Sequence, residues 1–73
     1  MATEPNILKR CGTRVRALRE QNGWSQETLA EKCDLDRTYI SGIERGLRNV
    51  SLVNLEIIAK AFKVSLSELF NDL

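Results

Sequence analysis

The segment from Ser25 to Asn49 constrains the fold more than any other part of the chain. Two short helices joined by a tight turn are predicted by its sequence, SQETLAEKCDLDRTYISGIERGLRN. Ser25 and Asp36 are expected to cap these helices, because a side-chain oxygen at that position accepts a backbone N–H group that has no partner within the helix. Gly46 is expected to end the second helix, which the pattern places at residues 37–45.

Helices are also predicted for the rest of the chain. Apolar residues recur at intervals of three and four positions near its start, which predicts a helix over residues 6–22 that ends at Gly23. Ser51 is expected to cap another helix. Ser65 is expected to begin the last one, because SLSE at 65–68 has the form of a capping box.

A single small domain is indicated by the length. The 73 residues are expected to form one all-α domain, a compact five-helix bundle over residues 6–73, after a flexible tail over residues 1–5. Such a domain buries only about 60% of the surface of its unfolded chain, so its stability depends on good packing or on a partner. The side chains expected on the inner faces of its helices are Ile7, Cys11, Val15, Leu18, Leu29, Ala30, Cys33, Ile40, Ile43, Leu55, Ile58, Ala59, Phe62, Leu66 and Leu69.

Charge is unevenly distributed, although the net charge is only +1. Residues 1–24 carry a net charge of +3, residues 25–36 carry −3, residues 37–50 carry +2 and the remainder carries −1. We therefore expect a folded chain that is basic on one face while nearly neutral overall.

Several classes of protein are disfavoured by what the sequence lacks. There is no histidine, so no thiol or hydroxyl has an imidazole base, and no Cys/His cluster or glycine-rich phosphate loop occurs. We therefore expect no enzyme, no metal, no cofactor and no small-molecule ligand. No apolar run reaches the roughly 20 residues of a membrane span and no secretory leader is recognised, so no membrane partner is expected. Cys11 and Cys33 are interpreted as reduced, buried thiols in preference to a disulfide.

Signature residues of a known family occur between about Leu8 and Phe70, namely Gln26, Leu29, Ala30, Leu35, Ile40, Ile43 and the sequence IERG at 43–46. By these residues the chain resembles the phage-repressor and Cro type of helix-turn-helix, also called the xenobiotic-response-element (XRE) family. The resemblance implies a lambda-repressor-like five-helix domain that binds operator DNA, usually as a dimer. The run at 35–49 resembles most closely the controller proteins of restriction–modification systems, and it also resembles other short bacterial regulators.

The chain differs from the usual pattern of this family at two positions. Asp34 lies in the turn, where the family usually has a small residue, often glycine, which tolerates a positive φ angle better. Trp24 occupies a position that is usually aliphatic. We interpret Trp24 as a lid on the core between the first two helices rather than as a stacking platform.

The start of the helix after Asp36 is expected to meet base edges in this docking mode. Arg37 can bridge two acceptors of guanine, and Thr38 can offer its methyl group to thymine or its hydroxyl to a base edge. The alternative for Arg37 is an ordinary solvated charge. Tyr39 is expected to contact the DNA backbone or sugar, and Ser41, on the same side as Thr38, allows close approach. The neighbouring glycine, Gly42, is expected to leave room for DNA.

Contacts with phosphate are expected on both sides of that helix. Gln26, the first residue of the preceding helix, is expected to hold a phosphate with the N–H groups of the helix N-terminus, the alternative being a plain exposed helix start. Arg45, Arg48 and Asn49 are expected to reach phosphates, and Arg48 can also reach a base. Asn54 is a weaker phosphate candidate.

An acid beside DNA is unfavourable, so Glu44 needs a different explanation. The resemblance places it against Arg19 as a partly buried ion pair with a structural role. The remaining cations of the first helix are interpreted as a solvated face with no assigned contacts: Lys9, Arg10, Arg14 and Arg16.

The helix after Ser51 carries more apolar surface than one core needs. The excess consists of Leu52, Val53, Ile57 and Ala61, to which the chain end adds Phe70 and Leu73. An isolated domain should not leave such a stripe in water, so we predict a two-fold dimer through this surface. The dimer would place two recognition helices about 34 Å apart, one turn of DNA, on a pseudo-palindromic operator.

The expected function is a sequence-specific, double-stranded DNA-binding transcriptional regulator, specifically a controller protein of restriction–modification genes. Its expected place is the cytoplasm and nucleoid of a bacterium or phage host, and RNA polymerase is a further candidate partner. The alternatives are a general stand-alone repressor of the same family, or a protein-interaction module such as an antitoxin on the same fold. RNA binding is less favoured, because aromatic stacking platforms are missing.

Overall fold

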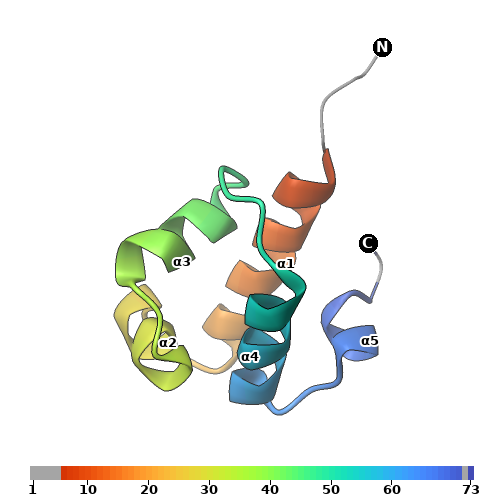
Figure 1. Ribbon diagram of the computed structural model, residues 1–73. Coiled ribbons are helices and arrows are strands. Elements are labelled where there is room, and N and C mark those ends of the chain that lie inside the picture. The colour runs from red at the N-terminus through yellow and green to blue at the C-terminus, as the bar shows by residue number, and fades with distance from the viewer. Residues whose placement is uncertain (1–5, 72) are drawn as a thin grey trace.

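The computed structural model describes residues 6–71 and residue 73. They form five helices: α1 (Asn6–Gln21), α2 (Gln26–Cys33), α3 (Arg37–Glu44), α4 (Leu52–Phe62) and α5 (Leu66–Leu69) (Figure 1). This part of the chain contains no strand. The prediction of an all-α, five-helix fold is confirmed, whereas the tail predicted over residues 1–5 lies outside the described residues.

Four of the helices begin as the sequence predicts. A serine or aspartate side chain precedes each and accepts a backbone N–H: Ser25 from Thr28, Asp36 from Thr38, Ser51 from Asn54 and Ser65 from Glu68. Each cap satisfies a donor that has no acceptor within its helix. The predicted helices 6–22 and 37–45 are each one residue too long, because the chain already leaves the helix after Gln21 and Glu44.

Four helices end in a residue with a positive φ angle. Gly23 (φ 72°) and Gly46 (φ 75°) adopt this conformation without a Cβ penalty, as predicted. Asp34 (φ 57°) adopts it after α2 although it is not a glycine. Lys63 (φ 61°) does the same after α4, which the sequence analysis did not anticipate. The backbone is strained at both positions, because a residue with a Cβ atom is unfavourable at a positive φ angle.

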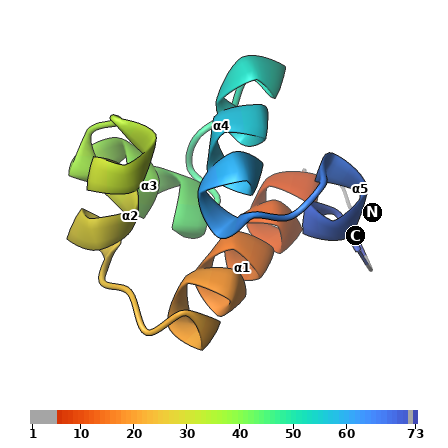
Figure 2. The ribbon, with the colours of Figure 1, turned by 90° about the horizontal axis from the view of Figure 1, so that it is seen from below.

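The helices are arranged around α1 and α4, with α2 and α3 on one side and α5 on the other (Figures 1 and 2). Contacts join α1 with α3, α2 with α3 and α4, and α4 with α5. The core contains side chains from all five helices: Cys11, Val15, Leu18, Leu29, Ala30, Cys33, Ile40, Ile43, Leu55, Ile58, Ala59, Phe62 and Leu69. These residues were all predicted to face inward.

Two of the predicted core residues are not buried. Ile7 is 48% exposed, because it lies in the first turn of α1, beyond the helices that cover the rest of its face. Leu66 is only half-buried, because α5 is a single turn at the edge of the fold. Cys11 and Cys33 are buried and free, as predicted, and burial raises the pKa of both thiols.

Trp24 packs against the core as predicted, but its main partner belongs to a different helix. Its ring stacks on Phe62 of α4, with the ring centroids 5.6 Å apart. The Lys32 ammonium of α2 lies 4.7 Å from the centroid of the same ring. Trp24 therefore also joins the loop between α1 and α2 to α4.

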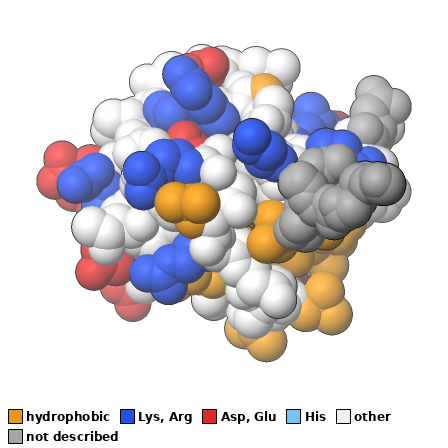
Figure 3. Space-filling model, turned by 90° about the horizontal axis from the view of Figure 1, so that it is seen from above, with side chains coloured by type: hydrophobic (Ala, Val, Ile, Leu, Met, Phe, Trp, Pro, Cys, Tyr) orange, Lys and Arg blue, Asp and Glu red, His pale blue; other side chains and the backbone are white. Residues whose placement is uncertain are grey.

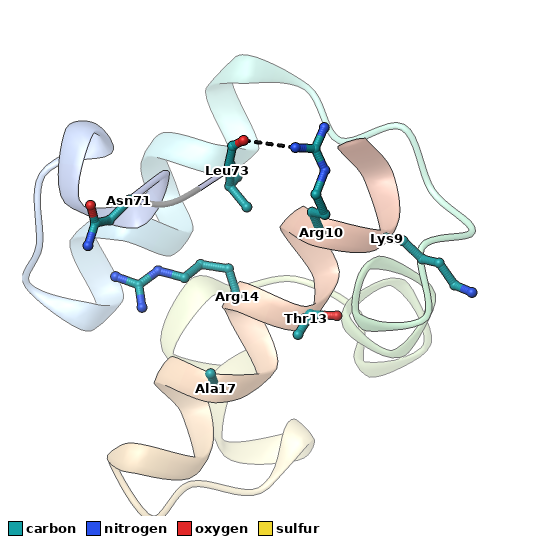
Figure 4. Close-up of a pocket in the computed structure, with 7 residues that line it drawn as sticks. All are labelled: Lys9, Arg10, Thr13, Arg14, Ala17, Asn71 and Leu73. Atoms are coloured by element: carbon teal, nitrogen blue, oxygen red, sulfur yellow. Dashed lines mark hydrogen bonds between the residues drawn. The ribbon is translucent and has the colours of Figure 1, made fainter. Parts of the chain in front are cut away.

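The short α5 is attached to α1 through arginine side chains (Figure 4). Arg14 donates from Nε to the Leu69 carbonyl (3.1 Å) and from Nη2 to the Glu68 carbonyl (2.8 Å). Arg10 donates from Nη1 to the Leu73 carbonyl (2.8 Å). The interpretation of Arg10 and Arg14 as a solvated face with no assigned contacts is therefore wrong. Arg14 bonds to the last two carbonyls of α5, where the helix end favours a cation, and Arg10 bonds to the backbone oxygen of Leu73.

None of the described helices is long and apolar enough to cross a membrane.

Candidate nucleic-acid interface

The first turn of α3 projects into solvent. Arg37 and Thr38 are both exposed, and Asp36 is exposed beside them. Asp36 Oδ1 accepts the Thr38 N–H (2.9 Å) and the Thr38 hydroxyl (2.8 Å). These two bonds, followed by the charges of Arg37 and Arg48, lower the pKa of Asp36 below its ordinary value. The Thr38 hydroxyl therefore has its hydrogen engaged, which leaves its oxygen lone pair and its methyl group for a base edge.

Tyr39 is held between two side chains from outside α3. Its ring is half-buried, and its hydroxyl accepts a hydrogen bond from Asn54 Nδ2 of α4 (3.0 Å). The Arg48 Cζ atom lies 5.3 Å from the ring centroid. The hydroxyl keeps its own hydrogen for a phosphate or sugar oxygen. Asn54, which we predicted as a weak phosphate contact, therefore has a partner within the protein, because its amide orients Tyr39.

Gln26, Glu44 and Arg19 form a hydrogen-bonded network behind the N-terminus of α2. Arg19 donates from Nε to Glu44 Oε2 (2.7 Å) and from Nη2 to Glu44 Oε1 (3.0 Å). The side chains are only 12% and 3% exposed, so the partly buried ion pair predicted between them is present. The hydrogen bond that Arg19 donates to Glu44 is the main cause that raises the pKa of Arg19.

Glu44 also fixes the direction of the Gln26 side chain. Gln26 Nε2 donates to Glu44 Oε1 at 3.0 Å, a contact that the sequence analysis missed. Gln26 is half-buried, so the alternative of a plain exposed helix start is wrong. An amide nitrogen carries two hydrogens, so Nε2 retains one donor for a ligand. Sequence spacing alone did not reveal this contact, because it joins residues on different helices.

The region after α3 is exposed and basic. Arg45, Arg48 and Asn49 are all exposed, whereas Ser41 on α3 is half-buried. Figure 3 looks onto the molecule from above Figure 1, where the α3–α4 loop lies, and it shows Lys and Arg side chains gathered there with Asp and Glu mainly at the edge. This arrangement agrees with the predicted basic face and suits contact with a polyanion.

Gly42 does not leave room for DNA, contrary to the prediction. Gly42 is buried, and a Cβ atom added there would lie only 2.8 Å from Arg48 Cγ. The space above Gly42 is therefore taken by the stem of Arg48.

A second surface, on α4 and α5, is apolar. Leu52 is 70% exposed and Val53 is 68% exposed, whereas Ile57, Ala61 and Phe70 are half-buried and pack against the core. Phe70 also lines a hollow of about 440 Å³. Its apolar lining comes from α1, α3, the α3–α4 loop, α4 and the chain end: Ile7, Leu8, Cys11, Ile43, Val50, Leu55, Phe70 and Leu73. Of the five residues predicted for a dimer interface, two are therefore exposed to solvent and three are half-buried.

Two helices that meet through a short turn, with the second one capped and exposed at its start, define a helix-turn-helix domain. A sequence profile of the helix-turn-helix family matches residues 15–69, which include α2, the turn and α3. The chain therefore belongs to the helix-turn-helix family.

Relatives within that family have a narrower description. The chain is 54% identical over 69 residues to the control protein C.MunI of Mycoplasma sp, with 93% of each protein covered. It is 52% identical to the restriction-modification controller protein C.AhdI from Aeromonas hydrophila, with a TM-score of 0.85 and coverage of 88% of this chain and 97% of that one. It is 43% identical to the controller protein C.Esp1396I, solved as a tetramer with its natural 35 base-pair operator, with a TM-score of 0.84 and coverage of 92% and 88%. The resemblance to controller proteins that residues 35–49 indicated is confirmed.

Proposed function

We propose that this chain is a transcriptional regulator that binds double-stranded operator DNA as a two-fold dimer and controls restriction–modification genes. The observation that carries the proposal is the exposed first turn of α3, where Arg37 and Thr38 project beyond a cap that fixes their backbone. A helix end with these side chains fits the major groove, where a guanidinium can bind both guanine acceptors. The similar controller protein C.Esp1396I, solved in complex with its natural operator, supports the proposal that this chain binds operator DNA.

Phosphate contacts would set the register of α3 on the duplex. Gln26 would donate its remaining amide hydrogen to a phosphate oxygen, while Glu44 keeps the side chain in place. The N-terminus of α2 adds N–H groups and a partial positive charge at the same point. The hydroxyl of Tyr39 and the cations Arg45 and Arg48, with Asn49, would bind the backbone on the far side of α3. The half-buried Ser41 would allow close approach without a large side chain.

The dimer would form through the apolar surface of α4 and α5. Leu52 and Val53 together expose an apolar area that a monomer would leave in water. A two-fold axis through this surface would present two copies of α3 to successive major grooves, and the operator would then be a pseudo-palindrome. The site of action would be the nucleoid in the cytoplasm. RNA polymerase would be a second partner if the bound dimer activates transcription.

A protein-interaction role, as in an antitoxin, is the main competing proposal, and salt dependence separates the two. We expect fluorescence anisotropy with a labelled duplex to give an affinity that falls linearly in log–log form, with a slope of about −0.9 per neutralised phosphate. Gln26→Ala should weaken binding to all sequences alike. Lys60→Ala, which removes an exposed charge from the last turn of α4, is the matched control and should leave affinity near that of the wild type. Absence of binding to any duplex at low salt would contradict the proposal.

The dimer is tested separately by sedimentation. Leu52→Ser combined with Val53→Ser should shift the protein to monomer at micromolar concentration and weaken DNA binding. Leu47→Ser, which changes a similarly exposed leucine (65%) in the α3–α4 loop, should leave self-association unchanged. A wild-type protein that remains monomeric both free and on DNA would refute the dimer.

A further inference from the structure

Gly42 lies inside α3, where its backbone does not require glycine. Among the described glycines only Gly23 and Gly46 have positive φ angles, so Gly42 has a conformation that alanine adopts readily. Glycine within a helix lowers stability relative to alanine, because it loses more backbone freedom on folding. A reason for glycine at this position must therefore come from what lies against it.

The stem of Arg48 lies against Gly42. A Cβ atom added at Gly42 would lie 2.8 Å from Arg48 Cγ and 3.3 Å from Arg48 Nε, and the first distance is shorter than real Cβ contacts allow. Gly12 shows the opposite situation, because the neighbours of an added Cβ there are backbone carbonyls of Ile43 and Glu44. Alanine at Gly42 would therefore displace a flexible side chain, whereas alanine at Gly12 would have to move the backbone.

The turn after α3 brings Arg48 to this position. The Gly46 N–H donates to the Ile43 carbonyl (3.0 Å), and the Leu47 N–H donates to the Gly42 carbonyl (2.9 Å). This pair of bonds is the Schellman motif, which folds the chain back along the helix that it ends. Arg48 therefore starts next to Gly42, and its stem can cross α3 only because no side chain is there.

Because its stem crosses α3, the guanidinium of Arg48 lies near the start of that helix. Its Cζ atom is 5.3 Å from the centroid of the Tyr39 ring, which Asn54 holds in turn. The charge of Arg48 acts on Asp36, the cap residue of α3, together with that of Arg37. Arg48, although it belongs to the α3–α4 loop, therefore has its charge close to the turn of α3 that contains Arg37.

We propose that Gly42 is a positioning residue for DNA recognition: its missing side chain provides the seat over which Arg48 reaches the Tyr39 ring, so that Arg48 and Arg37 face the duplex together. This inference rests on the proposed DNA-binding function. Because the seat is needed only for Arg48, alanine at position 42 should weaken DNA binding while the fold is kept.

A double-mutant cycle with Gly42→Ala and Arg48→Ala tests this coupling. Each single variant should lose operator affinity by about tenfold or more, and the double variant should bind no more weakly than Arg48→Ala alone. The thermal midpoint of the double variant should equal or exceed that of the wild type, because alanine favours helix once Arg48 no longer occupies the space. Losses that multiply in the double variant, or a Gly42→Ala variant with wild-type affinity, would overturn the proposal.

A measurement without DNA separates this proposal from the proposed function. In the wild-type protein, nuclear Overhauser effects should connect the Tyr39 ring protons with the Arg48 side-chain protons, and Gly42→Ala should abolish them. Their persistence in Gly42→Ala would overturn the role of Gly42 even if the protein binds DNA. A wild-type protein that shows the effects but binds no duplex would instead refute the DNA-binding function and leave the Gly42 seat intact.

Discussion

Arg19→Ala is expected to remove much of the stability of this domain. The change deletes both hydrogen bonds from Arg19 to Glu44 and a third, from Nη1 to the Trp24 carbonyl (2.8 Å). It leaves the Glu44 carboxylate, 3% exposed, with one remaining donor from Gln26. An unpaired buried charge of this kind costs about 3–5 kcal/mol. A domain of this length has a total stability of roughly 4–11 kcal/mol at the usual value per residue.

Urea unfolding followed by Trp24 fluorescence measures this loss, because that ring is stacked on Phe62 only in the folded protein. Protein concentration must be the same throughout, since self-association adds to apparent stability. Arg16→Ala is the matched control on the same helix, because Arg16 pairs with Glu20 (3.0 Å) at side-chain exposures of 63% and 57%. That exposed pair is worth at most about 1 kcal/mol. Equal losses in the two variants would refute the assignment of the Arg19–Glu44 pair as a buried structural interaction.

An apolar replacement of the pair separates stability from function. Arg19→Met combined with Glu44→Leu should keep wild-type stability or exceed it, because neither charge is left unpaired. The same variant deprives Gln26 of its acceptor, so we expect weaker binding to all duplexes alike. A stable double variant with wild-type DNA affinity would contradict the role of Glu44 in orienting Gln26.

Three further changes have definite expected outcomes. Lys63→Gly should raise the free energy of unfolding in urea by about 1 kcal/mol, because it relieves the strain of a positive φ angle, and no gain would contradict that strain. Asp36→Ala should destabilise α3 in thermal unfolding above the unfolded-state pKa of about 3.9, and its difference from the wild type should shrink as the pH falls through the lowered pKa of the folded cap. A difference that does not depend on pH would contradict the charged cap. Arg14→Ala should speed amide hydrogen exchange in α5, because it removes both hydrogen bonds that tie the Glu68 and Leu69 carbonyls to α1. Unchanged exchange would show that packing alone holds α5.

Local signals in the sequence predicted most of the helix positions. The caps Ser25, Asp36, Ser51 and Ser65 mark helix starts because their side-chain oxygens bond to an N–H only two or three residues away. Such contacts are decided within one turn of chain, so sequence spacing is enough to find them. Glycines at helix ends are visible for the same reason, whereas Lys63 takes that role without any signal in its residue type.

Contacts between helices were predicted less well. Gln26 was expected to hold a phosphate, but its hydrogen bond to Glu44 of α3 was not foreseen. Gly42 was expected to leave room for DNA, but the turn after α3 brings Arg48 over it. Both outcomes depend on how closely two segments approach, which periodicity does not specify. The Arg19–Glu44 pair was the exception, since the family resemblance supplied that contact in advance.

Selection of bound fragments from random duplex DNA, with the wild type and Arg37→Ala in parallel, tests most directly the claim that the first turn of α3 reads bases. The wild type is expected to select a two-fold symmetric site. Arg37→Ala should select the same site with the preference lost at one base pair in each half. Identical preferences for both proteins, or no enriched sequence for the wild type, would contradict the claim.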